Sequence, residues 1–260
     1  MSALGTSLIA LAVILGGAFG GTLLRSVLPE RQLADDTKDA VRPGTGLIGT
    51  ISALVLGLLI ASANNSFDAE NSHVQHMAAD FILLDQLLAQ YGSEATPARE
   101  KLRQVVDPLV DLIWRDGQSY TANRSPIEAT QAGQDTVATI LQLSPQTAVE
   151  RTLKDRAIQT AADLAQTRFL LFEQTGRRLP LPFLVVLIFW LAMIFASIGM
   201  FARPNPTLIA ALIVCAVSAS GAIFLVLELS NPFTGVMQIS SAPLRNALAP
   251  LSPPFLGSAS

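Results

Sequence analysis

Charged residues are scarce in this chain: they make up 14% of its 260 residues, where a soluble globular domain has about a quarter. Half of the residues are hydrophobic, and the mean hydropathy is +0.46. We therefore expect an integral membrane protein. The chain has a formal net charge of -3 at pH 7 and so lacks the excess of basic residues found in nucleic-acid-binding proteins. We therefore expect no nucleic-acid partner.

Cysteine, histidine and the usual catalytic motifs are nearly or wholly missing from the sequence. The single cysteine, Cys215, lies in an apolar run and has no partner for an internal disulfide, so we interpret it as a small packing residue. No Ser/His/Asp arrangement, nucleotide motif or phosphate-cradling glycine loop is present. We therefore expect that the protein is not an enzyme and that it has no catalytic residue and no cofactor.

Long apolar runs are the dominant feature of the sequence. They cover Ala3–Leu24, Thr45–Ala63, 181–200 and 207–229. Each has roughly the 20 residues that a helix needs to cross the hydrocarbon core. The first run is not preceded by basic residues and is longer than the core of a signal peptide, so we expect it to be retained. The segment 203–206, Arg-Pro-Asn-Pro, makes the turn of the last hairpin.

This pattern predicts an all-α integral membrane fold. We expect four transmembrane helices in two hairpins, with a helical soluble insert between the second and third. The expected parts are a first hairpin over 1–64, the helical soluble domain over 65–180, a second hairpin over 181–229, and a C-terminal tail over 230–260 that packs on the bundle or at the interface. The expected location is the cell (inner) membrane, multi-pass. Lysine and arginine counts near the spans give opposite answers for the side that the insert faces.

The insert shows helical periodicity and no alternating strand pattern. Its first stripe predicts an amphipathic helix that continues from the second span until Gly92 ends it. The stripe has one misfit, Glu70. Its residues are Phe67, Glu70, Val74, Met77, Phe81, Leu84, Leu88 and Tyr91. Further helices are expected over 97–114, kinked at Pro108, over 126–143, and from Ser144 to about Gln174. The last of these is expected to turn Val149, Leu153, Ala157, Ala161 and Leu164 inward.

Small residues form a stripe in the second span. Gly49, Ala53, Gly57 and Ala61 recur every four residues, and Thr50 adds a hydroxyl. Such a stripe lets another helix approach closely in lipid, and a hydroxyl-bearing face also suits a water-filled path. Both a helix contact and a pore lining fit this pattern, and either is compatible with the homo-oligomer that we expect.

Two groups of ionisable residues are candidate sites. Glu70, His73 and His76 have a spacing at which helical bundles present metal ligands. Such sites need a matching set on another helix, and the chain has no other histidine, so we favour ordinary solvated residues and expect no metal. Glu228 is the acidic residue within a predicted span. It is either an interface residue paired with Arg245 or capped by the tail, or part of an ion path. We predict contact with Arg245 or tail amides.

Several segments resemble a known family. The segments ILLDQLLAQYG, FLVVLIFWLAMIFASIGMF and FLVLEL followed by NPFTGVMQISSAPLRNAL are similar to the bacterial bestrophin-like membrane proteins, a family of uncharacterised function. The resemblance covers nearly the whole chain and implies two spans, a helical insert and two spans. The chain departs from the family at Ser230, where an acidic residue is usual, and in the order Arg203-Pro204. Its second span also lacks the aromatic constriction of bestrophin pores.

The resemblance implies distant kinship to bestrophins, which are oligomeric, calcium-regulated anion channels with a cytosolic helical domain. The function expected is therefore an oligomeric ion channel, with the lipid bilayer, further copies of the chain and an inorganic anion as partners. The alternative is a membrane-anchored scaffold or sensor whose soluble helices bind another protein through the stripe from Phe67 to Tyr91.

Overall fold

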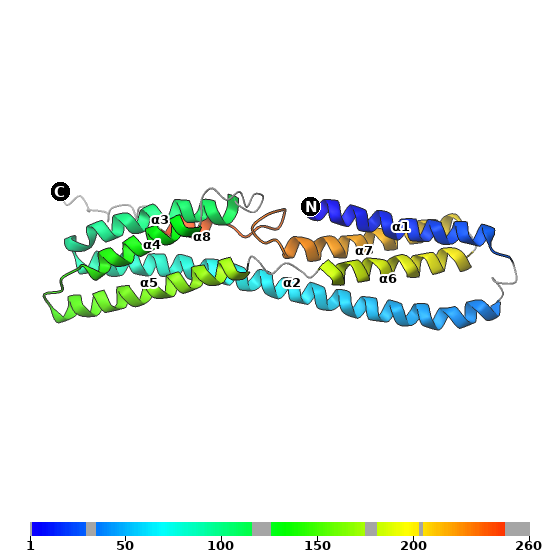
Figure 1. The fold of residues 1–260 in the computed structure, drawn as a ribbon, viewed down its shortest axis with the longest axis horizontal. Coiled ribbons are helices and arrows are strands. Elements are labelled where there is room, and N and C mark those ends of the chain that lie inside the picture. Colours follow the sequence, from blue (N-terminus) through cyan, green and yellow to red (C-terminus); the bar gives the residue numbers. More distant parts are fainter. Residues whose placement is uncertain (1, 30–34, 116–125, 175–180, 203–204, 248–260) are drawn as a thin grey trace, which may run out of the picture. The chain divides into compact units, whose positions relative to one another are not determined.

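Helices account for all regular structure in the described part of the chain (Figure 1). The computed structural model describes residues 2–29, 35–115, 126–174, 181–202 and 205–247. The helices are α1 (Ala3–Val27), α2 (Asp35–Tyr91), the short 3-10 helix η2 (Ser93–Ala95), α3 (Thr96–Arg115), α4 (Pro126–Leu141), α5 (Ala148–Gln174), α6 (Leu181–Phe201), α7 (Pro206–Leu229) and α8 (Ala242–Ala247). The described residues contain no strand, which confirms the all-helical prediction.

The chain forms two units. The first, which we call the apolar unit, comprises residues 1–67 and 178–231, and the second, the helical insert unit, comprises 68–177 and 232–260. Four helices, α1, α2, α6 and α7, are long and apolar enough to cross a membrane. Helix α2 begins at Asp35 and includes Pro43, so it starts ten residues before the apolar run Thr45–Ala63. Acidic residues at its start suit a helix N-terminus.

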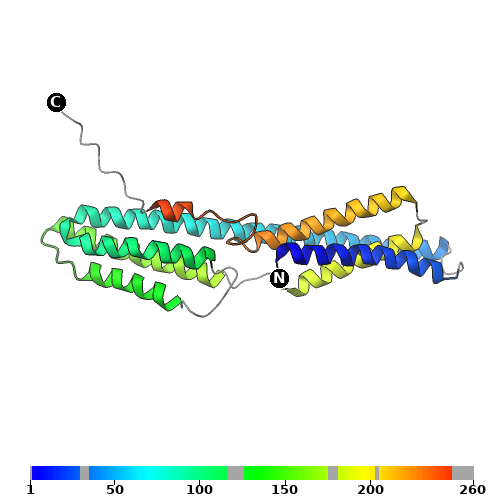
Figure 2. The same ribbon diagram turned by 90° about the horizontal axis from the view of Figure 1, so that it is seen from above.

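Helix α1 contacts both α6 and α7 in the apolar unit (Figures 1 and 2). Ile14 and Ala18 of α1 form a buried cluster with Phe195 of α6 and Ala216 of α7. Glycines bring the α1 and α6 backbones together: a Cβ at Gly17 would lie 2.5 Å from the Ala192 carbonyl oxygen. Close backbone approach at small residues is the usual way in which helices associate in lipid.

Helix α1 has two glycine pairs at a spacing of four residues, Gly16 with Gly20 and Gly17 with Gly21, and only the second pair contacts α6. Gly21 lies against Ala196 of α6, and Gly199 of α6 lies against Ala18, each leaving no room for a methyl group. A Cβ added at Gly16 or Gly20 would meet no atom within 4 Å. The face of α1 that carries Gly17 and Gly21 is therefore the packed face.

Polar side chains inside the apolar unit bond across helices. The Ser220 hydroxyl of α7 donates to the Ser7 carbonyl of α1 at 2.7 Å, and the hydroxyls of Thr45 and Ser197 lie 3.2 Å apart. At the end of α1, the Arg25 guanidinium donates to the Ala202 carbonyl. These bonds satisfy groups for which lipid offers no partner.

The helical insert unit packs the C-terminal half of α2 against its other helices. The predicted stripe is buried from Glu70 onward, with Val74, Met77 and Leu84 fully inaccessible to solvent. Gly92, whose φ of 117° favours glycine, follows the last residue of α2, as predicted.

Helix α5 differs from the prediction at its start. It begins at Ala148 instead of Ser144, because Thr147 and Glu150 form a capping box. The Thr147 hydroxyl accepts from the Glu150 amide at 3.1 Å, and the Glu150 carboxylate accepts from the Thr147 amide at 3.2 Å. Ala157 and Ala161 are buried as expected, whereas Val149 is 69% exposed, so its inward placement was wrong.

The described part of the tail packs within the helical insert unit. Phe233, Ile239 and Leu244 are buried, and α8 contacts α3. Trp114 of α3 donates from its indole Nε1 to the Ile239 carbonyl at 2.6 Å and meets the Phe233 ring edge to face, with centroids 5.4 Å apart. A partly buried tryptophan thus anchors the loop that precedes α8.

Candidate functional site

One face of α2 in the apolar unit carries only small side chains, and the chain leaves it uncovered. We call it the α2 strip and define it as Gly46, Thr50, Ala53, Gly57 and Ala61, which follow one another at steps of three or four residues. All five are exposed, and a Cβ added at Gly46 or Gly57 would meet no atom within 4 Å. No described helix of the same chain occupies this face.

The opposite face of α2 packs on the apolar unit and fixes which way the strip points. Leu56 and Leu59 lie against buried residues of α6 and α7, and Ala63 is buried beside Val226. Ser52 is 2% exposed on this packed face, and its hydroxyl has no partner among the described residues.

Gly49 lies at the edge of the strip, where a Cβ would be 4.0 Å from Ile194 Cδ1 of α6. The sequence grouped Gly49 with Ala53, Gly57 and Ala61 as one contact face. Within the described chain Gly49 is partly buried, while the other three are exposed. Exposed Leu54 and Leu58 flank the strip, at 74% and 70% exposure. A contact or a pore formed by this face thus involves another copy, and it stays a prediction.

The Thr50 hydroxyl is engaged within its own helix. It donates to the Gly46 carbonyl at 3.0 Å, a bond common for threonine in apolar helices. Its proton is therefore directed along the helix, and its oxygen lone pairs remain on the strip.

Glu228 is 3% exposed in the last turn of α7, and the residue makes an interaction within the protein. Arg245 is exposed on α8 in the other unit, so the predicted pairing of the two stays a prediction. Ser230, which stands where the family usually has an acid, ends the helix: its hydroxyl donates to the Val226 carbonyl at 2.6 Å.

Glu70 is the more unusual carboxylate of the helical insert unit. It lies beyond the apolar run of α2, is 6% exposed, and its Oε2 has no hydrogen-bond partner among the described residues. Burial raises its pKa from 4.5 to about 7. His73 is half-buried and His76 exposed. Within the described residues no three metal-ligating side chains come together, so nothing there supports a metal at Glu70, His73 and His76.

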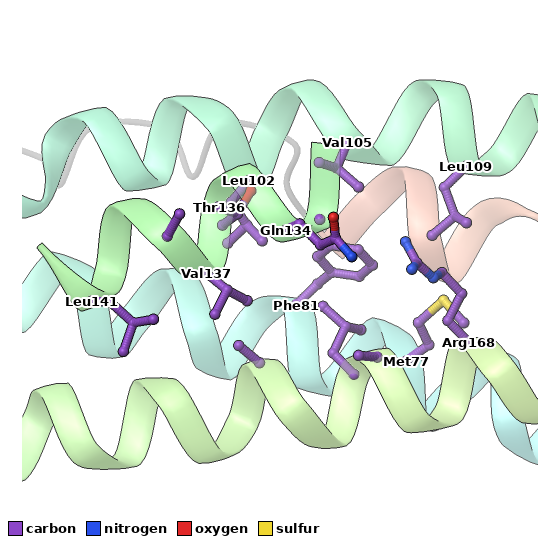
Figure 3. Close-up of a pocket in the computed structure, with 15 residues that line it drawn as sticks. Met77, Phe81, Leu102, Val105, Leu109, Gln134, Thr136, Val137, Leu141 and Arg168 are labelled. Carbon is purple, nitrogen blue, oxygen red and sulfur yellow. The ribbon is translucent and has the colours of Figure 1, made fainter. Parts of the chain in front are cut away.

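Sequence reasoning missed a cavity of about 420 Å³ in the helical insert unit (Figure 3). Its walls come from α2, α3, α4 and α5 and are mainly apolar, including Met77, Phe81, Leu102, Val105 and Leu164. The cavity is partly open to solvent.

A cation lies at the edge of this cavity. Arg168 of α5 is half-buried, and burial lowers the pKa of its guanidinium. Gly133 of α4 makes room for it, because a Cβ there would lie 3.2 Å from Arg168 Nη1. Arg168 also interacts within the protein. The small residues Gly133, Ala161 and Ala165 among the lining residues are the sequence signal for this space.

Comparison with known structures shows the same fold. The chain is similar to a variant of a bacterial bestrophin homologue from Klebsiella pneumoniae, with a TM-score of 0.67 and 13% identity over 96% of this chain and 100% of that one. A second variant of that homologue matches with a TM-score of 0.60 and 15% identity, over 95% of this chain and 98% of that one. A structure described as a membrane protein matches with a TM-score of 0.61 and 14% identity, over 92% of this chain and 97% of that one. No curated protein matches the sequence significantly.

A family model supports the assignment directly from the sequence. The model of the bestrophin-like domain matches residues 12–244, which include all or part of every helix described above. The resemblance of the tail motif and the fold agree with this match. The chain belongs to the bestrophin-like family.

Proposed function

We propose that the protein is a homo-oligomeric channel that passes inorganic anions across the cell (inner) membrane. In this proposal the two hairpins, over 1–64 and 181–229, span the bilayer. Residues 65–180 form a soluble helical domain, and residues 230–260 form a tail that packs on the protein. The helix lengths and apolar composition support the spans.

The α2 strip is the observation that carries the proposal. Closed symmetry repeats one face of every copy around a common axis. A face of glycine, alanine and threonine leaves room there for water and ions, whereas the flanking leucines suit contacts with neighbouring helices or lipid. The chain's own described helices do not cover the strip, so lipid, a neighbouring copy or a water-filled path can face it, and we assign it the path.

Preference for anions is supported by family membership, since the resemblance to bestrophins implies anion channels. The strip itself is uncharged. The Thr50 proton is bonded to the Gly46 carbonyl, so we do not assign anion selectivity to this hydroxyl. On this reasoning Thr50→Val, which keeps the side-chain shape, changes flux much less than a bulky residue on the strip does.

The burial of the stripe from Phe67 to Tyr91 removes the reason for the scaffold alternative. That alternative rested on the stripe as a surface for another protein. Val74, Met77 and Phe81 are at most 1% exposed inside the helical insert unit, so this stripe is not available to a partner. No other described feature favours a scaffold over a channel.

Anion flux through liposomes that contain the purified full-length protein tests the proposal. Wild-type protein should carry chloride, and Gly57→Leu should reduce the flux strongly. The matched control is Gly221→Leu on α7, another exposed glycine with no atom within 4 Å of an added Cβ. Absence of wild-type flux under varied pH and calcium would contradict the channel. An equal loss in both variants would contradict the role of the strip.

A further inference from the structure

The cavity of the helical insert unit combines an apolar interior with a polar edge. Its walls come from four helices of one unit, so its shape depends on that unit alone. Phe81 and Leu102, both at most 1% exposed, form part of the interior. At about 420 Å³ it falls in the range of about 300–1,000 Å³ typical of small-molecule sites.

Arg168, Gln134 and Thr136 supply the polar part of the lining, and Figure 3 shows Arg168 on α5 and Gln134 on α4. The guanidinium lies against Gly133, so the chain has a residue without a side chain where this cation needs space. Arg168 interacts within the protein, and its guanidinium carries five N–H donors in a planar fork.

The space is partly open to solvent, and most of its lining offers water no polar partner. An apolar group in contact with these walls would replace the missing dispersion contacts. A charged acceptor beside Arg168 would gain a charge-assisted hydrogen bond in surroundings of low polarity.

We propose that this cavity binds a single-chain carboxylate amphiphile of medium length, a fatty acid, with its alkyl chain among the apolar walls and its carboxylate at Arg168. Charge complementarity selects an anionic head over a neutral or cationic one. The cavity volume of about 420 Å³ favours one chain over the two chains of a membrane phospholipid.

Equilibrium dialysis of radiolabelled decanoate tests this proposal and does not depend on channel activity. The full-length protein is placed in phosphatidylcholine nanodiscs, and binding to empty nanodiscs is subtracted. We expect saturable binding of one decanoate per chain. Decanol should bind more weakly, and a short-chain phosphatidic acid with two acyl chains should not displace decanoate.

Two kinds of variant separate the head from the chain. Arg168→Gln should weaken decanoate binding about 10- to 100-fold while changing decanol binding less than about 2-fold. Arg156→Gln, an exposed arginine on the same helix, is the matched control and should leave both unchanged. Ala161→Leu, and Ala165→Leu at a more exposed lining position, should abolish binding of both ligands by filling the space.

Non-saturable binding equal to that of empty nanodiscs would overturn the proposal. An equal loss in the Arg168 and Arg156 variants would show general attraction to positive charge and would overturn it too. Far-UV circular dichroism and thermal unfolding identify a variant that has lost its fold. If Ala161→Leu does so, Ala165→Leu decides the result.

Discussion

Replacing Gly17 by alanine should destabilise the apolar unit out of proportion to the single methyl group added. The new Cβ would lie 2.5 Å from the Ala192 carbonyl oxygen, whereas a relaxed C···O contact needs about 3.3 Å. The carbonyl oxygen is a backbone atom and the position of Cβ is fixed by its own backbone, so no side-chain rotation can relieve the contact. Helices α1 and α6 must therefore separate by about 0.8 Å near this point.

A gap of this size forfeits roughly a quarter to a half of each nearby van der Waals contact. Together with the usual overpacking cost of about 1–3 kcal/mol, we expect Gly17→Ala to lower the free energy of unfolding by about 2–3 kcal/mol. Gly16→Ala is the matched control, because its Cβ would meet no atom within 4 Å. It should gain up to about 1 kcal/mol from helix propensity.

The assay is unfolding of purified protein in mixed micelles by added dodecyl sulfate, followed by tryptophan fluorescence, with Trp190 on α6 as the reporter. The midpoint of Gly17→Ala should move to lower dodecyl sulfate and that of Gly16→Ala should not. Equal stability of the two variants would refute the close approach of α1 and α6.

Three further predictions concern the helical insert unit. Burial raises the pKa of the Glu70 carboxyl from 4.5 to about 7. The free energy of unfolding is therefore highest below pH 4.5, where this group is protonated in both states, and it falls as the pH rises through 7. Denaturant titrations should show Glu70→Gln removing about 3 kcal/mol of this pH dependence, and an unchanged profile would contradict its burial. Arg99 bonds Asp85 through two parallel contacts of 2.9 Å, so Arg99→Lys should cost about 1–2 kcal/mol in thermal unfolding. Arg103→Lys, at 3.8 Å and more exposed, should cost under about 0.5 kcal/mol, and equal costs would refute the geometry. Trp114→Phe keeps a ring against the tail but loses the 2.6 Å bond to the tail carbonyl; limited proteolysis should then cut the tail faster, and an unchanged rate would argue against that anchor.

Local signals in the sequence predicted most of the helices. Apolar length located α1, α6 and α7 to within a few residues, and the stripe that continues past Ala63 predicted that α2 extends to Gly92. Even the misfit Glu70 follows the stripe into the interior, where its carboxyl is desolvated. Periodicity reports which face is buried because the side chains of one helix face share one environment.

Predictions failed where two local rules compete. The apolar run marks α2 only from Thr45 onward, whereas the helix begins at Asp35 and runs through Pro43. The start of α5 was placed at Ser144-Pro145 because proline often opens helices, whereas the Thr147–Glu150 capping box sets the start at Ala148. The capping box was readable from the sequence as T-x-x-E, so this error was avoidable.

The candidate sites depended on information that the sequence does not hold. Gly16 and Gly20 have the same spacing as Gly17 and Gly21, and only the position of α6 decides which pair is packed. Gly46 belongs to the uncovered strip although the apolar run was taken to begin at Thr45 and the stripe at Gly49. The cavity beside Arg168 arises from the spacing of four helices, which no single helix pattern encodes.

The most direct test of the central claim, that the α2 strip lines an anion pathway, is cysteine accessibility during flux. Cys215 is first replaced by serine, which leaves a chain without cysteine, and a single cysteine is then placed at Gly57 or, as control, at Gly221. We predict that an anionic methanethiosulfonate reagent blocks chloride flux through the Gly57→Cys protein, faster than a cationic reagent does, and leaves the Gly221→Cys protein conducting. Modification of Gly57→Cys without loss of flux would contradict the account.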